Sequence, residues 1–413
     1  MTENLAPAAG HRGDRADGSN RDDVVILGGA RTPNGRLNGQ LVGFSAVQLG
    51  AKAIAAALER AGIAAGRVDA VIMGQVVQAG AGQNPARQSA IGAGLGWDVP
   101  TVTVNKVCLS GLAAVTDAAR LVRAGEAEVV VAGGQESMTN GPHLLPGSRQ
   151  GWTYGNITAV ASVAHDGLTD AFDHESMGAS TERRNTELNI GRAVQDEVAA
   201  ASHQRAAAAA AAGIFAEEIV PVTVPQRKGP ALEISADEGV RPQTSVETLA
   251  PLRPAFAPDG TITAGNSSPL SDGAAALVLA TRGFAEDNGL PWLAVVGKPG
   301  QVAGPDTSLH SQPSNALGQA LKRAGWTAAE LDFIEINEAF GAVAVQSLKD
   351  LDYPLDRCNI HGGAIALGHP IGASGARLAL HAAYELRRRG TGRAGVALCG
   401  GGGQGEALLL YRD

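Results

Sequence analysis

Short apolar runs alternate with longer amphipathic segments along most of the chain. Four of these runs, VVIL from Val24, AVIM from Ala70, EVVVA from Glu128 and FIEI from Phe333, are apolar on both faces. Runs of this kind predict strands that are covered by helices on both sides of a sheet. Strands that alternate with helices indicate an α/β protein with a mainly parallel sheet and right-handed crossovers.

Local signals mark the ends of two predicted helices. Ser45 and Gln48 form an S-x-x-Q capping box, and Gly62 stands where the helix that follows is expected to end. Asn84 and Pro85 have the residue types typical of an N-cap and of the first helical position.

The chain also contains an internal repeat. The segment ALERAGIAAGRVDAVIMGQ from Ala57 aligns without gaps to ALKRAGWTAAELDFIEINE from Ala320, and both predict a helix, a turn and a buried strand. The turns around Cys108 and His369 then each end in Ser-Gly before an Ala-rich helix, and VVVAGG ending at Gly134 recurs as VALCGG. A duplicated unit constrains the fold of the whole chain. Two such units side by side predict a duplicated, five-layered α/β/α/β/α fold.

The repeat divides the chain into parts. Residues 1–22 are polar and are predicted to form a flexible tail. The first half is predicted to comprise residues 23–135 and 267–288, and the second half residues 289–413. Residues 136–266 are rich in turns and contain the basic stretch PQRKGP, so they are expected to form an inserted loop domain.

Composition and charge exclude several classes of protein. The 413 residues are 44% apolar and 18% charged, which excludes a disordered chain. The formal net charge of −8 disfavours a nucleic-acid-binding or anionic-membrane surface. The longest apolar stretch, around residues 206–216, is too short to span a bilayer. Three cysteines are an odd and sparse set, typical of free thiols in a reducing compartment, so a cytoplasmic location is expected.

Two candidate catalytic residues occupy equivalent turns of the repeat. Cys108 follows the predicted strand TVTVN and precedes a helix that begins near Ser110, and this position favours the thiolate. A small buried hydrophobic residue is the alternative. His369 lies in GGAIALGHPIGASG, where a hydrogen-bonded core histidine is the alternative. Because the two turns are duplicates, we expect them to meet and to form the pair of nucleophile and base that a thiol needs.

Two further candidates end predicted strands. Cys399 lies in LCGGGGQGEA, whose glycines leave the thiol unshielded and several backbone N–H groups free to point at one spot. The segment lacks the Lys-Ser/Thr end of a phosphate-binding loop. Asn337 begins NEAF at a transition from strand to helix, where an N-cap is also expected. Cys358 and His361 have a metal-like spacing, but no second ligand pair accompanies them, so no metal site is predicted.

Five segments in this order resemble the thiolase family: NKVCLSG around Cys108, GGQESM from Gly133, NEAF from Asn337, GGAIALGHPIGASG around His369 and CGGGGQG from Cys399. The likeness extends from about Val24 to Arg412. It implies two duplicated α/β halves, with an inserted CoA-binding loop domain in the first half. It also implies a homodimer or homotetramer, CoA thioesters as substrates and no additional cofactor.

The resemblance implies a role for each candidate residue. Cys108 is the nucleophile that becomes acylated, and His369 is its base and a donor to one oxyanion. Cys399 is the acid/base. Asn337 holds a water for the first oxyanion, and the backbone N–H groups of Cys108 and Gly401 stabilise the second.

The resemblance also implies four substrate-binding residues. Arg227 is placed near the nucleotide end of CoA, although a solvated loop is the alternative for this residue. Ser268 is similar to the serine that contacts the pantetheine arm. Leu168, together with Phe172 in DGLTDAF, resembles the segment that covers the pocket of short-chain members, and Phe340 of NEAF is expected at the substrate.

The implied reaction is the reversible Claisen condensation of two acetyl-CoA to acetoacetyl-CoA and CoA. A degradative 3-ketoacyl-CoA thiolase for longer chains is the alternative, and a noncatalytic acyl-CoA-binding relative is a remote one. A decarboxylating ketosynthase needs a second histidine where this chain has Asn337. Ser176 stands where many short-chain members have histidine, and Pro269 and Ser271 differ from the commoner glycine and asparagine. The segment from Gly304 is longer than usual, so the chain length of the substrate stays open.

Overall fold

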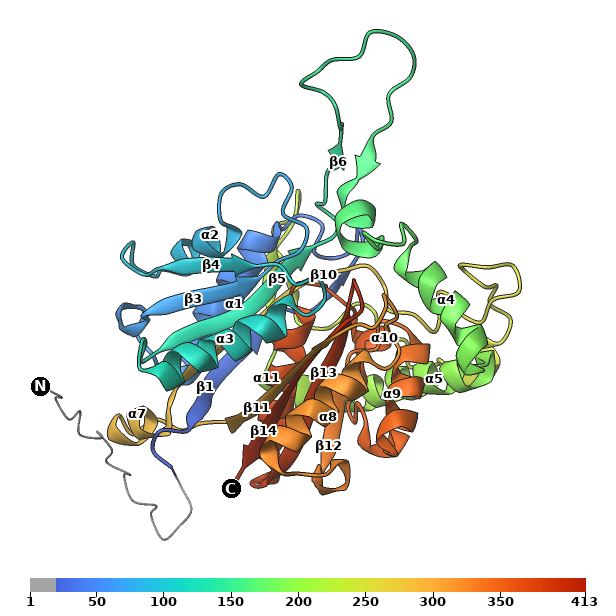
Figure 1. The fold of residues 1–413 in the computed structure, drawn as a ribbon. Coiled ribbons are helices and arrows are strands. Elements are labelled where there is room, and N and C mark those ends of the chain that lie inside the picture. Colours follow the sequence, from blue (N-terminus) through green and yellow to red (C-terminus); the bar gives the residue numbers. More distant parts are fainter. Residues whose placement is uncertain (1–19) are drawn as a thin grey trace, which may run out of the picture.

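The computed structural model describes residues 20–413 (Figure 1). Residues 1–19 of the predicted tail lie outside the described part. Just after them, the guanidinium of Arg21 forms ion pairs with Glu286 and Asp287 at 2.8 and 2.6 Å. Both acidic residues belong to helix α7 (Arg282–Asp287).

The main strands of both halves form one ten-stranded sheet. The strands of the first half are β1 (Val24–Arg31), β2 (Gly35–Arg36), β3 (Ala70–Gly74), β4 (Thr101–Val104), β5 (Val130–Ser137) and β10 (Ser271–Thr281). Those of the second half are β11 (Ala294–Ala303), β12 (Phe333–Ile336), β13 (Gly392–Gly400) and β14 (Gln404–Arg412).

The two halves repeat the same strand order. The first half runs β1-β10-β5-β3-β4 and the second runs β11-β14-β13-β12. A parallel bridge between Ile334 and Cys358 stands in the second half where β4 stands in the first. Strands β1 and β11 pair antiparallel and join the halves. The duplication that the repeat predicted is therefore confirmed.

The expectation of a mainly parallel sheet is wrong, because the sheet is mixed. Only the pairs β3–β4, β3–β5 and β12–β13 are parallel among these main strands. Strands β13 and β14 are joined by the tight turn at residues 401–403, and such a turn forces antiparallel pairing. Strand β10 likewise runs antiparallel to β5, as β14 does to β13, although residues 138–270 separate β5 from β10 along the chain.

Helices cover the sheet in layers (Figure 1). The first half contains α1 (Ala46–Ala61), α2 (Pro85–Gly92) and α3 (Ser110–Ala124), and the second contains α8 (Gln312–Ala324), α9 (Gly341–Leu351), α10 (Ala364–Leu367) and α11 (Ser374–Arg389). Helices α3 and α11 pack together, and one buried apolar cluster joins them to strands of both halves. A second cluster packs α1 and α2 on the other face of the first half, and a third packs α8 on that of the second. The strands of the two halves thus form two β layers, with α3 and α11 between them and one further helix layer on each outer face. This five-layered arrangement confirms the predicted fold class.

The predicted helix ends are confirmed. The Ser45 hydroxyl accepts a hydrogen bond from the Gln48 N–H, and the Gln48 side chain accepts one from the Ser45 N–H. Gly62 ends α1 with a φ of 67°, a conformation that glycine adopts without steric cost. The Asn84 side chain caps α2 by accepting from the Arg87 N–H.

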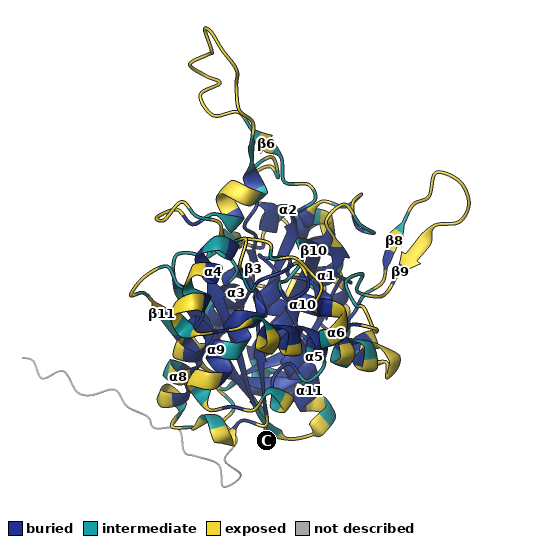
Figure 2. Ribbon diagram, turned by 90° about the vertical axis from the view of Figure 1, so that its right-hand side faces the viewer, coloured by how far each residue is buried: buried dark blue, intermediate teal, exposed yellow. Residues whose placement is uncertain are grey.

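The chain between β5 and β10 forms smaller elements and two projections. These are β6 (His143–Leu144), β7 (Val160–Ala161), a π-helical turn (Val163–Leu168), α4 (Met177–Leu188), α5 (Arg192–Ala211), β8 (Val222–Val224), β9 (Leu232–Ile234) and α6 (Val246–Leu249). Short 3₁₀ turns at Ala65–Arg67, Ile214–Glu217, Ala328–Glu330 and Leu355–Arg357 complete the chain. The segment between β6 and β7 and the β8–β9 hairpin extend into solvent (Figure 2). None of the helices described in residues 20–413 has the length and apolarity needed to cross a membrane.

A buried charge cluster fastens the segment between β5 and β10 to both halves. Arg31 Nε lies 2.7 Å from Glu218 Oε1, and its two terminal nitrogens lie 2.7 and 2.9 Å from the Asp237 carboxylate. His381 Nδ1 lies 2.8 Å from Glu218 Oε2. Burial opposes the charge on Glu218, but His381 and Arg31 outweigh it and hold the pKa of this carboxyl below its ordinary value.

Candidate active site

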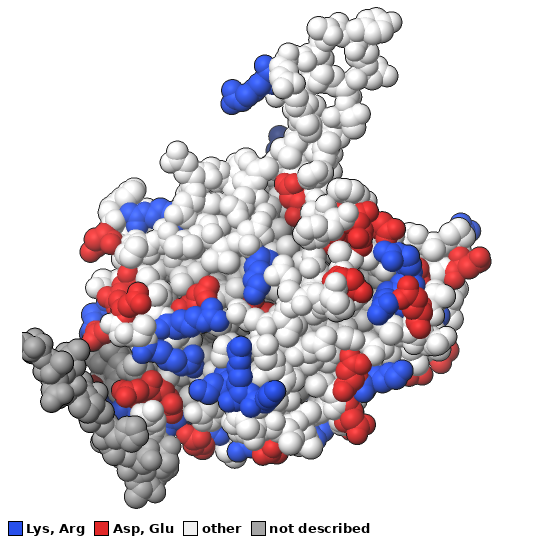
Figure 3. All heavy atoms as spheres, viewed as in Figure 1, with Lys and Arg blue, Asp and Glu red and all other residues white. Residues whose placement is uncertain are grey.

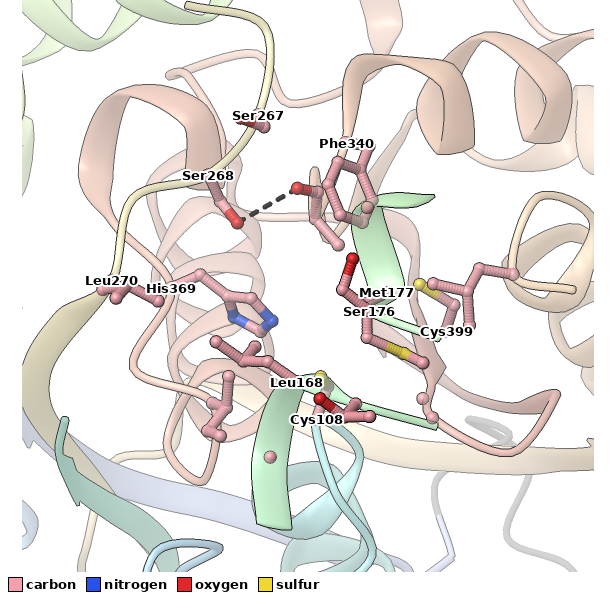
Figure 4. A pocket seen from close by; sticks show the side chains of 18 of the residues that line it. Cys108, Leu168, Ser176, Met177, Ser267, Ser268, Leu270, Phe340, His369 and Cys399 are labelled. Atoms are coloured by element: carbon pink, nitrogen blue, oxygen red, sulfur yellow. Dashed lines mark hydrogen bonds between the residues drawn. The ribbon is translucent and has the colours of Figure 1, made fainter. Parts of the chain in front are cut away.

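A cavity of about 300 Å³ lies where the two halves meet the segment between β5 and β10. The predicted residues that line it are Cys108, Leu168, Ser268, Phe340, His369, Cys399 and Gly401. Figure 4 shows the side chains of Cys108, His369 and Cys399 facing this cavity from separate parts of the chain. The remaining lining is largely apolar, as is typical of small-molecule sites.

Cys108 lies in the turn between β4 and α3. The backbone N–H groups of Cys108 itself and of Gly401 are close enough to stabilise its thiolate. Burial nevertheless raises the pKa of the Cys108 thiol to about 12, and the negative charge of Glu136 adds to this effect. The backbone N–H groups at this turn favour the thiolate, but the desolvation of a charged sulfur outweighs them.

His369 presents an unprotonated nitrogen to the cavity. Its Nδ1 lies 2.6 Å from Ser374 Oγ, and that hydroxyl donates to the Pro370 carbonyl at 3.0 Å. Nδ1 therefore carries the ring proton, and Nε2 is the acceptor. Burial lowers the pKa of His369 to about 3, with a further contribution from the positive charge of Arg377. A neutral imidazole whose Nε2 is unprotonated has the state required of a base for a thiol.

Asn337 contacts the Nε2 of His369. Its Nδ2 lies 3.3 Å from His369 Nε2. Its Oδ1 is buried and has no hydrogen-bond partner among residues 20–413, so it is available to a water molecule. Helix α9 begins only at Gly341, with Phe340 at the N-cap position. The expectation that Asn337 caps this helix is therefore wrong.

Cys399 lies near the end of β13, beside a turn of three glycines. Burial and the neighbouring Cys108 raise the pKa of its thiol. Gly402 has a φ of 73°, and its N–H donates to Asp170 Oδ2 at 3.1 Å. The Asp170 carboxylate thus holds the turn that carries the Gly401 N–H.

The predicted substrate-binding residues are divided between two places. Ser268 donates its hydroxyl hydrogen to the Ala339 carbonyl at 3.1 Å, and Leu168 and Phe340 line the cavity beside it. Phe172 is 75% exposed and does not line the cavity. Arg227 is exposed on the β8–β9 hairpin, outside the cavity lining.

Sequence reasoning missed several residues of the site. The repeat could have indicated Ser374, because it aligns this residue with Ser110. In the structure each of the two serines donates a hydrogen bond to a backbone carbonyl of its own turn. Ser271 accepts the His369 N–H at 3.0 Å. Leu309, from the long segment after Gly304, lines the cavity, and no local pattern indicates this.

No cluster of three or more His, Cys, Asp or Glu side chains within residues 20–413 could hold a metal ion. Of the pair with metal-like spacing, Cys358 is buried. The Nδ1 of His361 lies 3.1 Å from the Nε2 of His381.

Comparisons with known proteins agree with this architecture. The family model described as "Thiolase, N-terminal domain" matches residues 24–283, and "Thiolase, C-terminal domain" matches residues 290–412. The chain is 58% identical over 388 residues to a probable acetyl-CoA acetyltransferase of Mycolicibacterium smegmatis, covering 94% of this chain and 100% of that protein. It is 48% identical over 391 residues to an acetyl-CoA acetyltransferase of Pseudomonas aeruginosa, covering 95% of this chain and 100% of the relative. A probable acetyl-CoA acetyltransferase of Escherichia coli is 46% identical over 391 residues, covering 95% of this chain and 99% of the relative. The chain therefore belongs to the thiolase family.

Proposed function

We propose that the protein is an acetyl-CoA acetyltransferase that reversibly condenses two acetyl-CoA to acetoacetyl-CoA and CoA through an acyl-cysteine. The observation that carries the proposal is the single cavity shared by Cys108, His369 and Cys399. The names of relatives that are 45–58% identical over most of the chain support it. Only CoA thioesters take part as substrates, and no further cofactor is needed.

The first step is acylation of Cys108. The Cys108 thiol passes its proton to His369 Nε2 as the sulfur attacks the thioester carbonyl of acetyl-CoA. The proton moves during the attack, because burial raises the pKa of Cys108 and lowers that of His369, and both shifts disfavour a resting thiolate–imidazolium pair. When the tetrahedral intermediate collapses, the bond to the CoA sulfur breaks, and this sulfur takes a proton from Cys399.

The second step is carbon–carbon bond formation. The Cys399 thiolate removes a proton from the methyl group of a second acetyl-CoA, and the resulting carbanion attacks the acetyl group on Cys108. The raised pKa of Cys399 makes its thiolate a strong base once it has formed. The bond to the Cys108 sulfur then breaks, and the proton on His369 returns to that sulfur.

Two sets of donors suit the negative charge that develops on oxygen. The N–H groups of Cys108 and Gly401 converge near the nucleophile and suit the tetrahedral intermediate. His369 with a water held by Asn337 suits the enolate of the second acetyl-CoA. Each such donor contributes roughly 3–4 kcal/mol to lowering a barrier of this type.

A comparison of substrates separates this function from the degradative alternative. The apolar walls formed by Met177, Leu309 and Phe340 leave only a small cavity beside the cysteines. We therefore expect acetoacetyl-CoA to be cleaved with a higher kcat/KM than a 3-ketoacyl-CoA of eight or more carbons. The measurement is thiolysis of both substrates under the same conditions. A preference for the longer substrate would assign the degradative function, and failure to trap labelled acetyl on Cys108 would indicate a noncatalytic relative.

We also propose that Arg227 binds the nucleotide end of CoA, whose phosphates need positive charge on a protein of net charge −8. Its exposure on the β8–β9 hairpin suits an end of the substrate that stays outside the cavity. Arg227→Ala should raise KM for acetyl-CoA and change kcat little, since the lost contact is made equally in the ground and transition states. S-acetyl-pantetheine, which lacks the nucleotide, is the control and should react equally with both proteins. An unchanged KM for acetyl-CoA would contradict this role.

A homo-oligomer in the cytoplasm completes the proposal. Strand β4 ends the strand order of the sheet, and Val102 on it is 55% exposed, which is the kind of edge that a second strand can cover. The segment between β6 and β7 carries the exposed apolar residues Leu145, Trp152, Tyr154 and Ile157, and Figure 3 shows few charged side chains on it. The free state of all three cysteines suits a reducing compartment.

A further inference from the structure

Glu136 is a buried carboxylate that the reaction scheme does not use. It lies in β5, and no part of its side chain is exposed. Its Oε2 accepts the N–H of Val76 at 2.9 Å and the N–H of Gly372 at 3.0 Å, and its Oε1 accepts the N–H of Val77 at 3.2 Å. Within residues 20–413, no Lys, Arg or His side chain forms an ion pair with it. The charge is therefore compensated only by backbone dipoles.

These three N–H groups belong to different halves of the molecule. Val76 and Val77 follow β3 in the first half, whereas Gly372 lies three residues after His369 in the second. The turn after β3 and the turn at Gly372 meet backbone to backbone, because a Cβ at Gly372 would lie 2.8 Å from the Cα of Gln75. The Glu136 carboxylate thus connects the turn that carries the base to the half that carries the nucleophile.

The same carboxylate is close enough to influence the nucleophile. Its charge raises the pKa of the Cys108 thiol. Burial raises the pKa of Glu136 itself to about 7, while the N–H groups of Val76, Val77 and Gly372 oppose that shift. A buried carboxylate without a cation is costly. This cost beside a nucleophile indicates a function beyond packing.

Displacement of the base-bearing turn would also alter the cavity wall. Ile371, next to Gly372, packs in one apolar cluster with Val76 and Met138, and Cys108 and Leu168 contact this cluster. The Glu136 carboxylate accepts hydrogen bonds from the N–H of Val76, a member of this cluster, and from the N–H of Gly372, the neighbour of Ile371.

We propose that Glu136 is a positioning residue for acyl transfer, whose carboxylate docks the His369 turn against the turn that follows β3, in the half that carries Cys108, and so places the imidazole at the thiol. This inference rests on the proposed function. It assigns Glu136 no contact with substrate. Its effect on the reaction passes through the place of His369.

Glu136→Gln tests the proposal. The glutamine amide has one acceptor oxygen and one NH₂ group, whereas both oxygens of Glu136 accept backbone N–H groups. In either orientation of the amide, its NH₂ group therefore faces a backbone N–H, and at least one hydrogen bond is lost. A misplacement of about 1 Å costs about 10²-fold in rate. We therefore expect acetylation of Cys108 by saturating acetyl-CoA to slow by about 10²-fold, with KM nearly unchanged. Alkylation of Cys108 by iodoacetamide should be at least as fast as in the unmodified protein, because a negative charge near the thiol is removed.

Glu182→Gln is the matched control. Glu182 is also buried, and it accepts the backbone N–H groups of Thr261 and Ile262, each at 2.7 Å, away from the nucleophile turn. Glu182→Gln should lower thermal stability, but it should not slow the acetylation of Cys108 while leaving its alkylation undiminished. Glu136→Asp is the second variant. It keeps the charge but withdraws the carboxylate by one methylene, so a smaller loss of acetylation is expected.

The outcomes are distinguishable. If the Glu136→Gln protein is folded and its Cys108 is acetylated slowly but alkylated at an undiminished rate, the result supports the proposal that Glu136 positions the His369 turn. Equal losses of both reactions, or acetylation at the unmodified rate, would overturn it. If the unmodified protein is not acetylated at Cys108 at all, the proposed function fails, whatever the variants do.

Discussion

Replacing Cys399 by serine should stop condensation while leaving Cys108 able to take up an acetyl group. A serine hydroxyl is too weak an acid to form the base that removes a methyl proton. Loss of general acid/base catalysis costs between about 10² and 10⁴ in rate. Acylation should persist, because the CoA thiolate, with a thiol pKa of about 8.5, can leave without a proton. The measurements are the rate of acetoacetyl-CoA formation and the incorporation of labelled acetyl into the protein.

Cys358→Ser is the control for this experiment. Cys358 is buried outside the cavity and should be dispensable for both readings. Cys108→Ser should abolish the labelling that Cys399→Ser retains. Undiminished condensation in Cys399→Ser would show that another group removes the methyl proton.

Replacing Arg31 by methionine should lower the free energy of unfolding by about 3–5 kcal/mol, because a buried ion cluster is broken. Arg31 is 1% exposed and is the cation that both Glu218 and Asp237 contact. Without it, Asp237 keeps its buried charge with no ion-pair partner among residues 20–413, and Glu218 keeps only His381 there. Denaturation by urea at neutral pH measures the change.

Arg21→Met is the matched control for stability. Arg21 also pairs with two carboxylates, Glu286 and Asp287, but its side chain is 37% exposed. Exposed pairs contribute about 0–1 kcal/mol. A cost for Arg31→Met no larger than that for Arg21→Met would contradict the view that this cluster holds the inserted segment in place.

The sequence predicted the layered, duplicated fold and the residues that meet in the cavity, because both leave local traces. Helix periodicity and capping residues mark α1 and α2, and the repeat relates the Cys108 turn to the His369 turn. The direction of β10 left no such trace. Its apolar run is equally suitable for parallel or antiparallel pairing, and its neighbour β5 precedes it by more than a hundred residues.

The protonation states of the site also could not be predicted from local sequence. The position of Cys108 before a helix favours a thiolate, yet burial raises its pKa to about 12. How far a sulfur lies from solvent depends on every layer packed around it. The contacts of Glu136 with Gly372 and of Asp170 with Gly402 join residues more than two hundred positions apart, so no local pattern could indicate them.

Chain order and residue identity were thus sufficient for the fold class, the duplication and the reactive groups, since periodicity and internal similarity are properties of the chain itself. Packing was needed to establish strand direction, the raised pKa of the Cys108 thiol and the lowered pKa of the His369 imidazole, and the carboxylates that hold the turns of Gly372 and Gly402. These features depend on desolvation and on distances across the molecule, and both exist only after the two halves have come together.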